Sequence, residues 1–298
     1  MLRFMLSLSL ALLISLTGIG LVIAHQWGWS EYASPELYVV YYQAKRERPY
    51  GFFMVDAAGS GGSWSLTTHS VTLTTLNCSP DGRTLAFLTD DAHLYVVNQS
   101  GLVYERVLDQ RRTVLNVANN GMVALSDLSQ VRQGGSVLLD ARQTLALVPP
   151  DGSSYESVEP SSLGTAIWNR ADYSGVHITT LSGEMIATFP RVDVPKWFAS
   201  EQILTYDDIG ALPAERVLAD PSTRKLIRLN SALMRGVFSP DGTRRATNMI
   251  EPGSANVQII VTDALSTDHS EQLTHSSGVI YVPICFLTFR PTMLISGS

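Results

Sequence analysis

The fold of this chain is decided by the stretch Leu76-Asn77-Cys78-Ser79-Pro80-Asp81-Gly82-Arg83-Thr84-Leu85-Ala86-Phe87, which returns far downstream as Gly236-Val237-Phe238-Ser239-Pro240-Asp241-Gly242-Thr243. Each copy places an apolar position before Ser-Pro-Asp-Gly, and the first copy continues into an apolar strand. Proline presets φ, aspartate bonds nearby backbone amides, and glycine accepts a positive φ. We therefore predict tight turns between strands at two places, Pro80-Asp81-Gly82 and Pro240-Asp241-Gly242.

The two copies also define a repeat. Ser79 and Ser239 are 160 residues apart, which is about four units of roughly 40 residues, the length of one four-stranded propeller blade. Short strands followed by small polar turns recur along the chain at a mean spacing of roughly 40 residues. These strand-turn units are Phe52–Gly59, Leu94–Gly101, Leu145–Gly152, Val176–Gly183, Val217–Ser222 and Ile259–Ala264.

Both ends of the chain carry unfinished units. Val279–Phe289 has the pattern of a first strand, whereas Leu37–Tyr42 and Gly51–Asp56 form a hairpin that lacks one. Joining the two ends completes one blade and removes two open strand edges. We predict an all-β, six-bladed propeller over residues 31–298, closed by pairing N- and C-terminal strands, with seven blades as the alternative. Met293–Ile295 competes with Leu37–Tyr42 for the same strand position.

In these residues the chain resembles the propeller repeat of TolB-type periplasmic proteins, a WD40-like repeat. That repeat has an apolar residue, Ser-Pro-Asp-Gly, a strand, a second strand ending near Asp-x-x-Gly, and an outer strand. Residues 79–101 match it almost position by position, residues 239–263 match it well, and residues 113–230 match only in rhythm. The resemblance implies a propeller that acts as a periplasmic partner in envelope complexes. TolB-type proteins carry a small α/β domain before the propeller, for which we expect no room here.

An apolar segment precedes the predicted propeller. Residues 4–24 are apolar apart from Ser, Thr and Gly, and Arg3 is the only charged residue before them. About twenty apolar residues suffice to cross a bilayer as a helix. No Lys or Arg follows until Lys45, so the positive-inside rule places Arg3 in the cytoplasm and the rest of the chain outside.

We predict that residues 1–30 form an uncleaved signal-anchor helix with its interfacial residues. Trp27 and Trp29 stand where an aromatic belt at the membrane interface is expected. Cleavage near Ala24, which would release a secreted protein, is the alternative, although the apolar run is longer than that of most cleaved signals. Both interpretations place the propeller outside the cytoplasm, on the periplasmic side or at the cell surface.

Composition narrows the class of protein. Apolar residues make up 45% of the chain and charged residues 16%, a balance typical of a globular domain with a substantial core. The net charge of −6, with Lys and Arg scattered, argues against a nucleic-acid partner. We interpret the two cysteines, Cys78 and Cys285, as buried small hydrophobic residues. A disulfide between them requires the ring to close and their strands to align.

No catalytic template fits the sequence. Gly-x-Ser-x-Gly, His-Glu-x-x-His and paired Cys-x-x-Cys motifs are absent. His269 and His275 are the only histidines that are near neighbours. Glycosidase chemistry needs two facing carboxylates, and we expect the acidic loop residues to form turns or to be solvated. These are Asp90, Asp91, Asp207, Asp208 and Glu251. We therefore predict no enzyme, no cofactor and no metal.

Three functions remain open. The first is a protein-interaction or scaffold module of an envelope or membrane complex, tethered by residues 4–24. The second is a hydrolase or lyase acting on a glycan or lactone at the channel mouth, and the third is a subunit whose anchor packs against other helices. Three or more converging His, Asp or Glu side chains at the channel mouth would favour the enzyme. A channel lined by small and hydroxyl residues, with an apolar patch on one end face, would favour partner binding.

Overall fold

The computed structural model describes the chain from Leu37 onward. The residues described are 37–45, 48–58, 63–66, 72–108, 114–126, 136–147, 149–152, 155–170, 172, 174–210, 215–229, 236–250, 257–263, 270–274, 279–288 and 291. The predicted anchor at residues 4–24, with Trp27 and Trp29, lies outside these ranges. Over the ranges given, no helix has both the length and the apolar character needed to cross a membrane.

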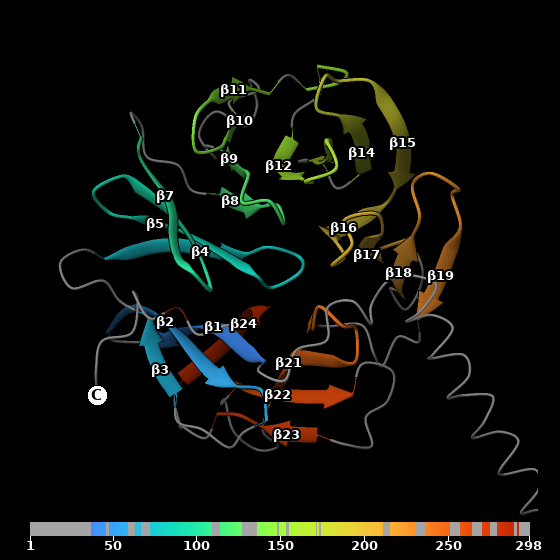
Figure 1. The fold of residues 1–298 in the computed structure, drawn as a ribbon. Coiled ribbons are helices and arrows are strands. Elements are labelled where there is room, and N and C mark those ends of the chain that lie inside the picture. Colours follow the sequence, from blue (N-terminus) through green and yellow to red (C-terminus); the bar gives the residue numbers. More distant parts are fainter. Residues whose placement is uncertain are drawn as a thin grey trace, which may run out of the picture.

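The described strands form blades arranged as a ring (Figure 1). Blade 1 contains β4 (Leu73–Cys78), β5 (Thr84–Thr89), β6 (His93–Asn98) and β7 (Gly101–Val107). Blade 2 contains β8 (Val114–Val117), β9 (Val123–Ser126), β10 (Ser136–Leu139) and β11 (Thr144–Ala146). Blade 3 contains β12 (Tyr155–Pro160), β13 (Thr165–Arg170), β14 (Gly175–Thr180) and β15 (Met185–Pro190). Blade 4 contains β16 (Val192–Trp197), β17 (Leu204–Asp208), β18 (Glu215–Ala219) and β19 (Leu226–Leu229).

Two further blades complete the ring. Blade 5 contains β20 (Val237–Phe238), β21 (Arg244–Ile250), β22 (Val257–Asp263) and β23 (Ser270–Gln272). Blade 6 contains β24 (Val279–Leu287), β1 (Tyr38–Lys45), β2 (Arg48–Asp56) and β3 (Ser63–Leu66). A parallel pair, Val257 with Ile280, also links blades 5 and 6 into one sheet.

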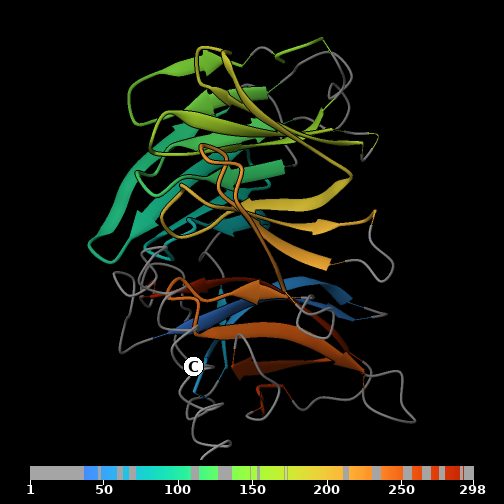
Figure 2. The ribbon, with the colours of Figure 1, turned by 90° about the vertical axis from the view of Figure 1, so that its right-hand side faces the viewer.

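Blade 6 confirms the predicted closure from both chain ends. β24 pairs antiparallel with β1 along its whole length, from Leu287 opposite Tyr38 to Val279 opposite Lys45. In Figure 2 the blue N-terminal strands lie beside the red C-terminal strand. The ring therefore has six blades, as predicted, and Met293–Ile295 lies outside the described residues.

The hairpin of blade 6 is tighter than the sequence predicts. The apolar pattern predicts strands that end at Tyr42 and resume at Gly51, whereas β1 continues to Lys45 and β2 begins at Arg48. Lys45 lies directly opposite Arg48. The charged residues extend the ladder because pairing satisfies their backbone N–H and C=O groups whatever their side chains are.

Buried apolar side chains fill the contacts between successive blades. Six clusters of buried residues lie in the part of the chain that the structure describes, and each joins two neighbouring blades. Inner strands such as β5 are buried at every position, as expected for a strand covered on both faces. The outermost strand β15 instead alternates between exposed and buried residues in its second half.

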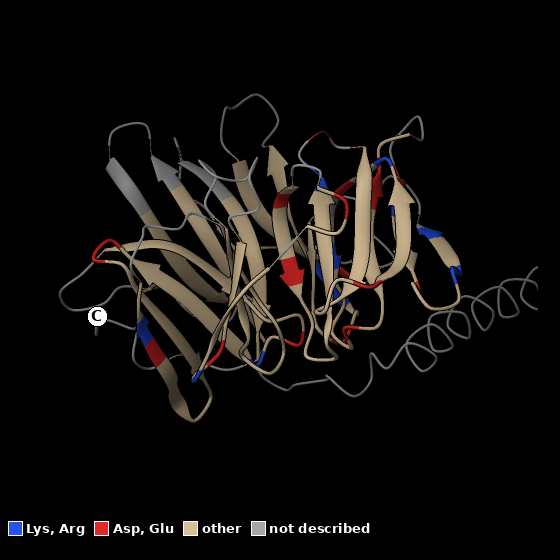
Figure 3. Cartoon of the chain, turned by 90° about the horizontal axis from the view of Figure 1, so that it is seen from above, with Lys and Arg blue, Asp and Glu red and all other residues tan. Residues whose placement is uncertain are grey.

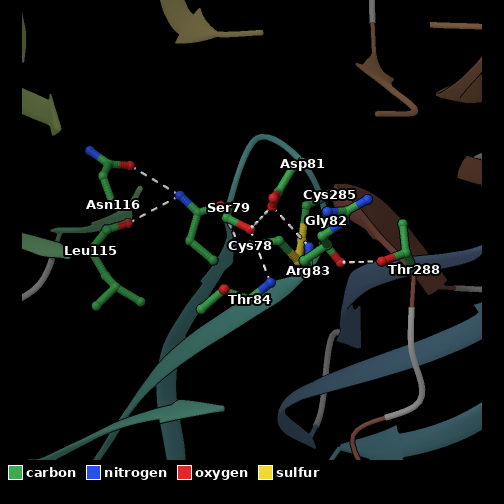
Figure 4. Close-up of a disulfide and its surroundings, with 11 residues drawn as sticks. Cys78, Ser79, Asp81, Gly82, Arg83, Thr84, Leu115, Asn116, Cys285 and Thr288 are labelled. Carbon is green, nitrogen blue, oxygen red and sulfur yellow. Dashed lines mark hydrogen bonds between the residues drawn. A yellow bond between two sulfur atoms is a disulfide. The ribbon is translucent and has the colours of Figure 1, made fainter. Parts of the chain in front are cut away.

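A disulfide between Cys78 and Cys285 corrects our interpretation of both cysteines as unbonded hydrophobic residues. Cys78 ends β4 of blade 1, and Cys285 lies within β24 of blade 6 (Figure 4). Their Cα atoms are 5.9 Å apart, within the usual range for a disulfide. The bond therefore ties the closing strand to the next blade of the ring.

Candidate protein-binding face

Five turns join the first and second strands of blades 1 to 5 at one end of the channel, which we call the turn face. Each turn closes with a hydrogen bond from the N–H of its fourth residue to the C=O of its first residue, at N···O distances of 2.6 to 3.1 Å. In every one the fourth residue has a positive φ, between 55° and 82°. The fourth residues are Gly82, Gly121, Gly164, Glu201 and Gly242.

The two Ser-Pro-Asp-Gly segments form the turns of blades 1 and 5. In blade 1 the Ser79 hydroxyl donates to Asp81 Oδ1 at 2.5 Å, and the same oxygen accepts the Arg83 N–H at 3.0 Å. Asp241 accepts the corresponding bonds from Ser239 and Thr243. Burial raises the pKa of the Asp81 carboxyl, and the hydrogen bond from Ser79 opposes that rise. Both aspartates are therefore engaged in holding their own turns.

Gly82 lies where three blades meet. Its carbonyl oxygen accepts hydrogen bonds from the Thr288 N–H at 2.9 Å and the Thr288 hydroxyl at 3.1 Å (Figure 4). A Cβ at this position would lie 2.9 Å from the Phe286 carbonyl oxygen and 2.9 Å from Pro240 Cγ. The turn of blade 1 is thus packed against both the closing strand and the turn of blade 5.

We expect Gly82→Val to lower the free energy of unfolding by about 2–4 kcal/mol, because it combines a left-handed φ with overpacking against backbone. Gly152→Val is the matched control, since Gly152 has φ of 71° and open space around its Cβ position. It should cost only the conformational part, about 1–2 kcal/mol. Denaturant unfolding followed by circular dichroism measures both values, and equal losses would contradict the packing of Gly82 described above.

Glu201 occupies the position that glycine holds in the other four turns. Its φ is 55°, and the residue is 1% exposed. Its carboxylate accepts the Asn119 N–H and the Ser162 N–H, each at 2.6 Å, and also the Ser162 hydroxyl. The Asn119 side chain donates to the Ala199 carbonyl and accepts the Asp81 N–H. The turns of blades 4, 3 and 2 are therefore connected through one buried carboxylate, and the Asn119 side chain extends the connection to the turn of blade 1.

We expect Glu201→Gly to lower the free energy of unfolding by about 1–2 kcal/mol, although it places glycine at a positive φ. The substitution removes hydrogen bonds to a charged group, which contribute about 1.5–3 kcal/mol. Glycine adopts a positive φ without the cost that Glu201 bears there, and this gain offsets part of the loss. Denaturant unfolding is again the measurement. An increase in stability would mean that the crossing bonds contribute less than the strained backbone costs.

The same carboxylate predicts a pH dependence. Burial raises the pKa of Glu201 above its ordinary value of 4.5, against hydrogen bonds from Ser162 and Asn119. The folded state thus holds this proton more tightly than the unfolded state does. Its contribution is greatest below about pH 4.5 and falls as pH rises through the folded pKa. The unfolding free energy of the natural protein minus that of Glu201→Gln should therefore decrease with pH in this window, and a rise would contradict the assignment.

The central channel contains a cavity of about 130 Å³. Its polar lining includes Asn77, Asn116, Glu159 and Lys196, from the innermost strands of blades 1 to 4, together with Ser79, Thr205, Arg216 and Ser239. Asn77 Nδ2 donates to Asn116 Oδ1 at 3.0 Å, and Lys196 Nζ pairs with Glu159 Oε1 at 2.5 Å. Hydroxyl residues therefore line part of this cavity, together with amides, one ion pair and Arg216.

A larger groove of about 720 Å³ lies at the turn face between blades 3 and 4, and we call it the blade 3–4 groove. Ile178, Trp197 and Ile203 are buried and form its floor. Leu163 is 56% exposed and Ile186 is 36% exposed at its edge. The polar residues around it are Thr165, Ser200, Glu201, Gln202, Asp220, Ser222, Thr223 and Lys225.

The acidic residues singled out from the sequence that the structure describes are each engaged with a separate partner. Asp207 pairs with Arg216 at 2.7 Å and Asp208 with Arg228 at 2.9 Å. Asp91 accepts the Thr89 hydroxyl, and Asp90 accepts the Thr72 N–H. Glu251, His269 and His275 lie outside the described ranges. Among the residues described, no group of three His, Cys, Asp or Glu side chains is arranged to hold a metal ion.

The charged residues that the structure describes are dispersed. In the view of Figure 3, basic and acidic residues are interleaved over the strands and turns, without a continuous basic face. The turn face thus combines turns that are already hydrogen-bonded, a small polar channel and an apolar groove. This geometry defines a six-bladed propeller with an apolar groove at one end.

Several solved structures have a fold similar to that of this chain. No protein-family model matches the sequence, and no curated protein sequence matches it. TolB from Acinetobacter baumannii is similar in structure over 83% of this chain and 66% of its own, at 11% identity and a TM-score of 0.55. A protein of unknown function from Bacteroides caccae is similar over 85% and 98%, at 8% identity and a TM-score of 0.50.

A putative TolB from Agrobacterium tumefaciens matches over 80% of this chain and 89% of its own, at 13% identity and a TM-score of 0.43. At such identities the similarity establishes architecture and leaves function to be argued from the site. The expected resemblance to TolB-type propellers is confirmed as a likeness of fold. The chain spans 66% of the length of the TolB structure from Acinetobacter baumannii.

Proposed function

We propose that this chain is a membrane-tethered, extracytoplasmic propeller that binds a protein partner of an envelope or membrane complex at its turn face. The blade 3–4 groove carries the proposal. Leu163 and Ile186 expose apolar surface beside a buried apolar floor, and a concave apolar surface with polar groups around it is typical of a binding site. Propellers commonly present such surfaces on their ends, and the TolB-like fold is consistent with this role.

Two observations support the extracytoplasmic location. Residues 4–24 are apolar and are preceded only by Arg3 among charged residues, which favours an anchor with its N-terminus in the cytoplasm. The disulfide between Cys78 and Cys285 favours an oxidising compartment, because thiols are kept reduced in the cytosol. A reporter that is active only in the cytoplasm, fused after Ser30, should be inactive. Activity from that fusion would overturn the proposed topology.

A hydrolase or lyase is supported less well by the same residues. Asp81 and Glu201 are the buried carboxylates of the turn face, and both accept hydrogen bonds from turn backbones. Their oxygens are therefore already engaged in holding the turns. No specific observation favours a glycan or lactone as ligand.

The proposal is tested by site-specific photocrosslinking in intact cells. A photoreactive amino acid at Leu163 or Ile186 should give the same discrete adduct with one protein. Val107 on β7 is the matched control, because it is apolar and 71% exposed on a different blade. Adducts that form equally well at Val107, or no adduct at either groove position, would overturn the proposal.

A further inference from the structure

The charged side chains beside the blade 3–4 groove differ in the hydrogen bonds and ion pairs that they make. The Asp220 carboxylate accepts the Ser222 N–H at 2.8 Å, the Ser222 hydroxyl at 2.6 Å and the Thr223 hydroxyl at 2.7 Å. Glu201, which also lines the groove, is buried and holds Asn119 and Ser162. Both carboxylates thus accept hydrogen bonds from their own or adjacent turns, and these bonds hold the Asp220 carboxylate in its charged form.

The two basic side chains of the turn between β18 and β19, beside the groove, are not engaged in this way. Lys225 lines the groove and is exposed, and its ammonium group makes no hydrogen bond or ion pair with any residue that the structure describes. Arg224, its neighbour in the same turn, is exposed and equally unpaired within those residues. In a chain of net charge −6, this turn presents two unpaired positive charges beside an apolar surface.

The edge of blade 3 adds a third feature. β15 is the outermost strand of its sheet and pairs with β14 alone among the described strands. Ile186, which lines the groove, is a residue of β15. The free edge of an outer strand presents N–H and C=O groups that an added strand can pair with. Since Ile186 belongs to this strand, an extended chain that contacts Ile186 lies near that edge.

We propose that the blade 3–4 groove binds an extended segment of the partner protein in which apolar side chains are accompanied by Asp or Glu. The inference rests on the proposed function and states the chemistry of the partner at that site. The apolar side chains contact Leu163 and Ile186, and the carboxylates lie against Arg224 and Lys225. Complementary charge steers association and sets specificity, while apolar contact supplies most of the affinity.

The test is a selection from a display library of random 12-residue peptides on the full chain, solubilised in detergent. The selected peptides should be enriched in Asp, Glu and apolar residues. They should bind about tenfold more weakly to the double variant Arg224→Glu/Lys225→Glu, which should itself select basic peptides. Arg142→Glu is the matched control, because Arg142 is exposed in the equivalent turn of blade 2. It should leave binding within about twofold.

Further variants and one further peptide distinguish the possible outcomes of this test. Circular dichroism checks that each variant folds. Peptides that need Leu163, lost in Leu163→Asp, but ignore both charge reversals would overturn the acidic chemistry and leave the proposed function standing. Peptides indifferent to Leu163→Asp would overturn both. A synthetic peptide of residues 25–36, which contains Glu31 and Glu36, is included. If it binds through Leu163 and Lys225 more tightly than the selected peptides do, the occupant is this chain's own linker and the partner proposal is overturned.

Discussion

A chain that lacks residues 279–298 is expected to be insoluble or to unfold without a cooperative transition. The deletion removes β24, which pairs with all of β1. It also removes Phe286 and Leu287, which are buried in two different clusters between blades. The loss of one inner strand, of a buried residue from each of two clusters and of a disulfide is of the same order as the roughly 5–15 kcal/mol that stabilises a typical domain.

Thermal and denaturant unfolding of the purified proteins, together with size-exclusion chromatography, make the measurement. A chain that lacks only residues 292–298 is the matched control, because it keeps β24 and Cys285. It should unfold cooperatively, like the full chain. A soluble, cooperative protein without residues 279–298 would show that the ring does not depend on the strand supplied by the C-terminus.

Replacing both cysteines, in Cys78→Ala/Cys285→Ala, is expected to lower the free energy of unfolding by about 2–5 kcal/mol. The disulfide joins residues 207 positions apart, and in the chain-entropy account a long loop gives the larger stabilisation. It also holds β24 to blade 1 at the place where the ring closes (Figure 4). Both effects act against opening of the propeller.

Reductant distinguishes this effect from a simple packing defect. Under denaturant titration, dithiothreitol should shift the midpoint of the natural protein toward that of the double variant and leave the variant unchanged. Equal midpoints for the oxidised natural protein and the variant would show that the bond adds nothing to stability. If the double variant no longer unfolds cooperatively, its destabilisation would instead be caused by the loss of buried side-chain volume.

Local patterns predict the blades well where the turn motif is sharp. In blade 1 the pattern around Pro80-Asp81-Gly82 predicts strands at Thr72–Cys78, Thr84–Leu88, Leu94–Asn98 and Leu102–Leu108, whose ends lie within one residue of those of β4 to β7. The closing strand was predictable for a different reason: the incomplete units at the two chain ends cover their open strand edges by pairing with each other. Residues 113–230 carry no second sharp copy, yet their spacing of roughly 40 residues sufficed to count the blades.

The disulfide was not predictable because its geometry depends on register between strands far apart in the sequence. Cys78 ends an inner strand, whereas Cys285 lies beside an irregularity in the β1–β24 pairing near Val40 and Tyr41. Sequence periodicity fixes that a strand exists, but the sliding of one strand along another decides which side chains meet. Two cysteines in neighbouring inner strands therefore remain compatible with either outcome until the register is known.

Glu201 was missed because the blade 4 turn lacks the glycine that marks the others. A signal was present: the fourth turn residues Gly82, Gly121, Gly164 and Gly242 recur about every 40 residues, and Glu201 falls in the same series. A charged residue at a position that needs a positive φ is uncommon and points to a specific role. The blade 3–4 groove had no such signal, since it arises from how two whole blades lie against each other.

Because both chain ends contribute strands to blade 6, the propeller can close only after the C-terminal strand has been synthesised. A ribosome releases β1, β2 and β3 first, and more than two hundred residues separate β3 from β24. Until β24 emerges, β1 has an unpaired edge, and that edge is open to other nascent chains. We therefore expect maturation to depend on a holding chaperone and on an oxidase that joins Cys78 to Cys285 as the last step of assembly.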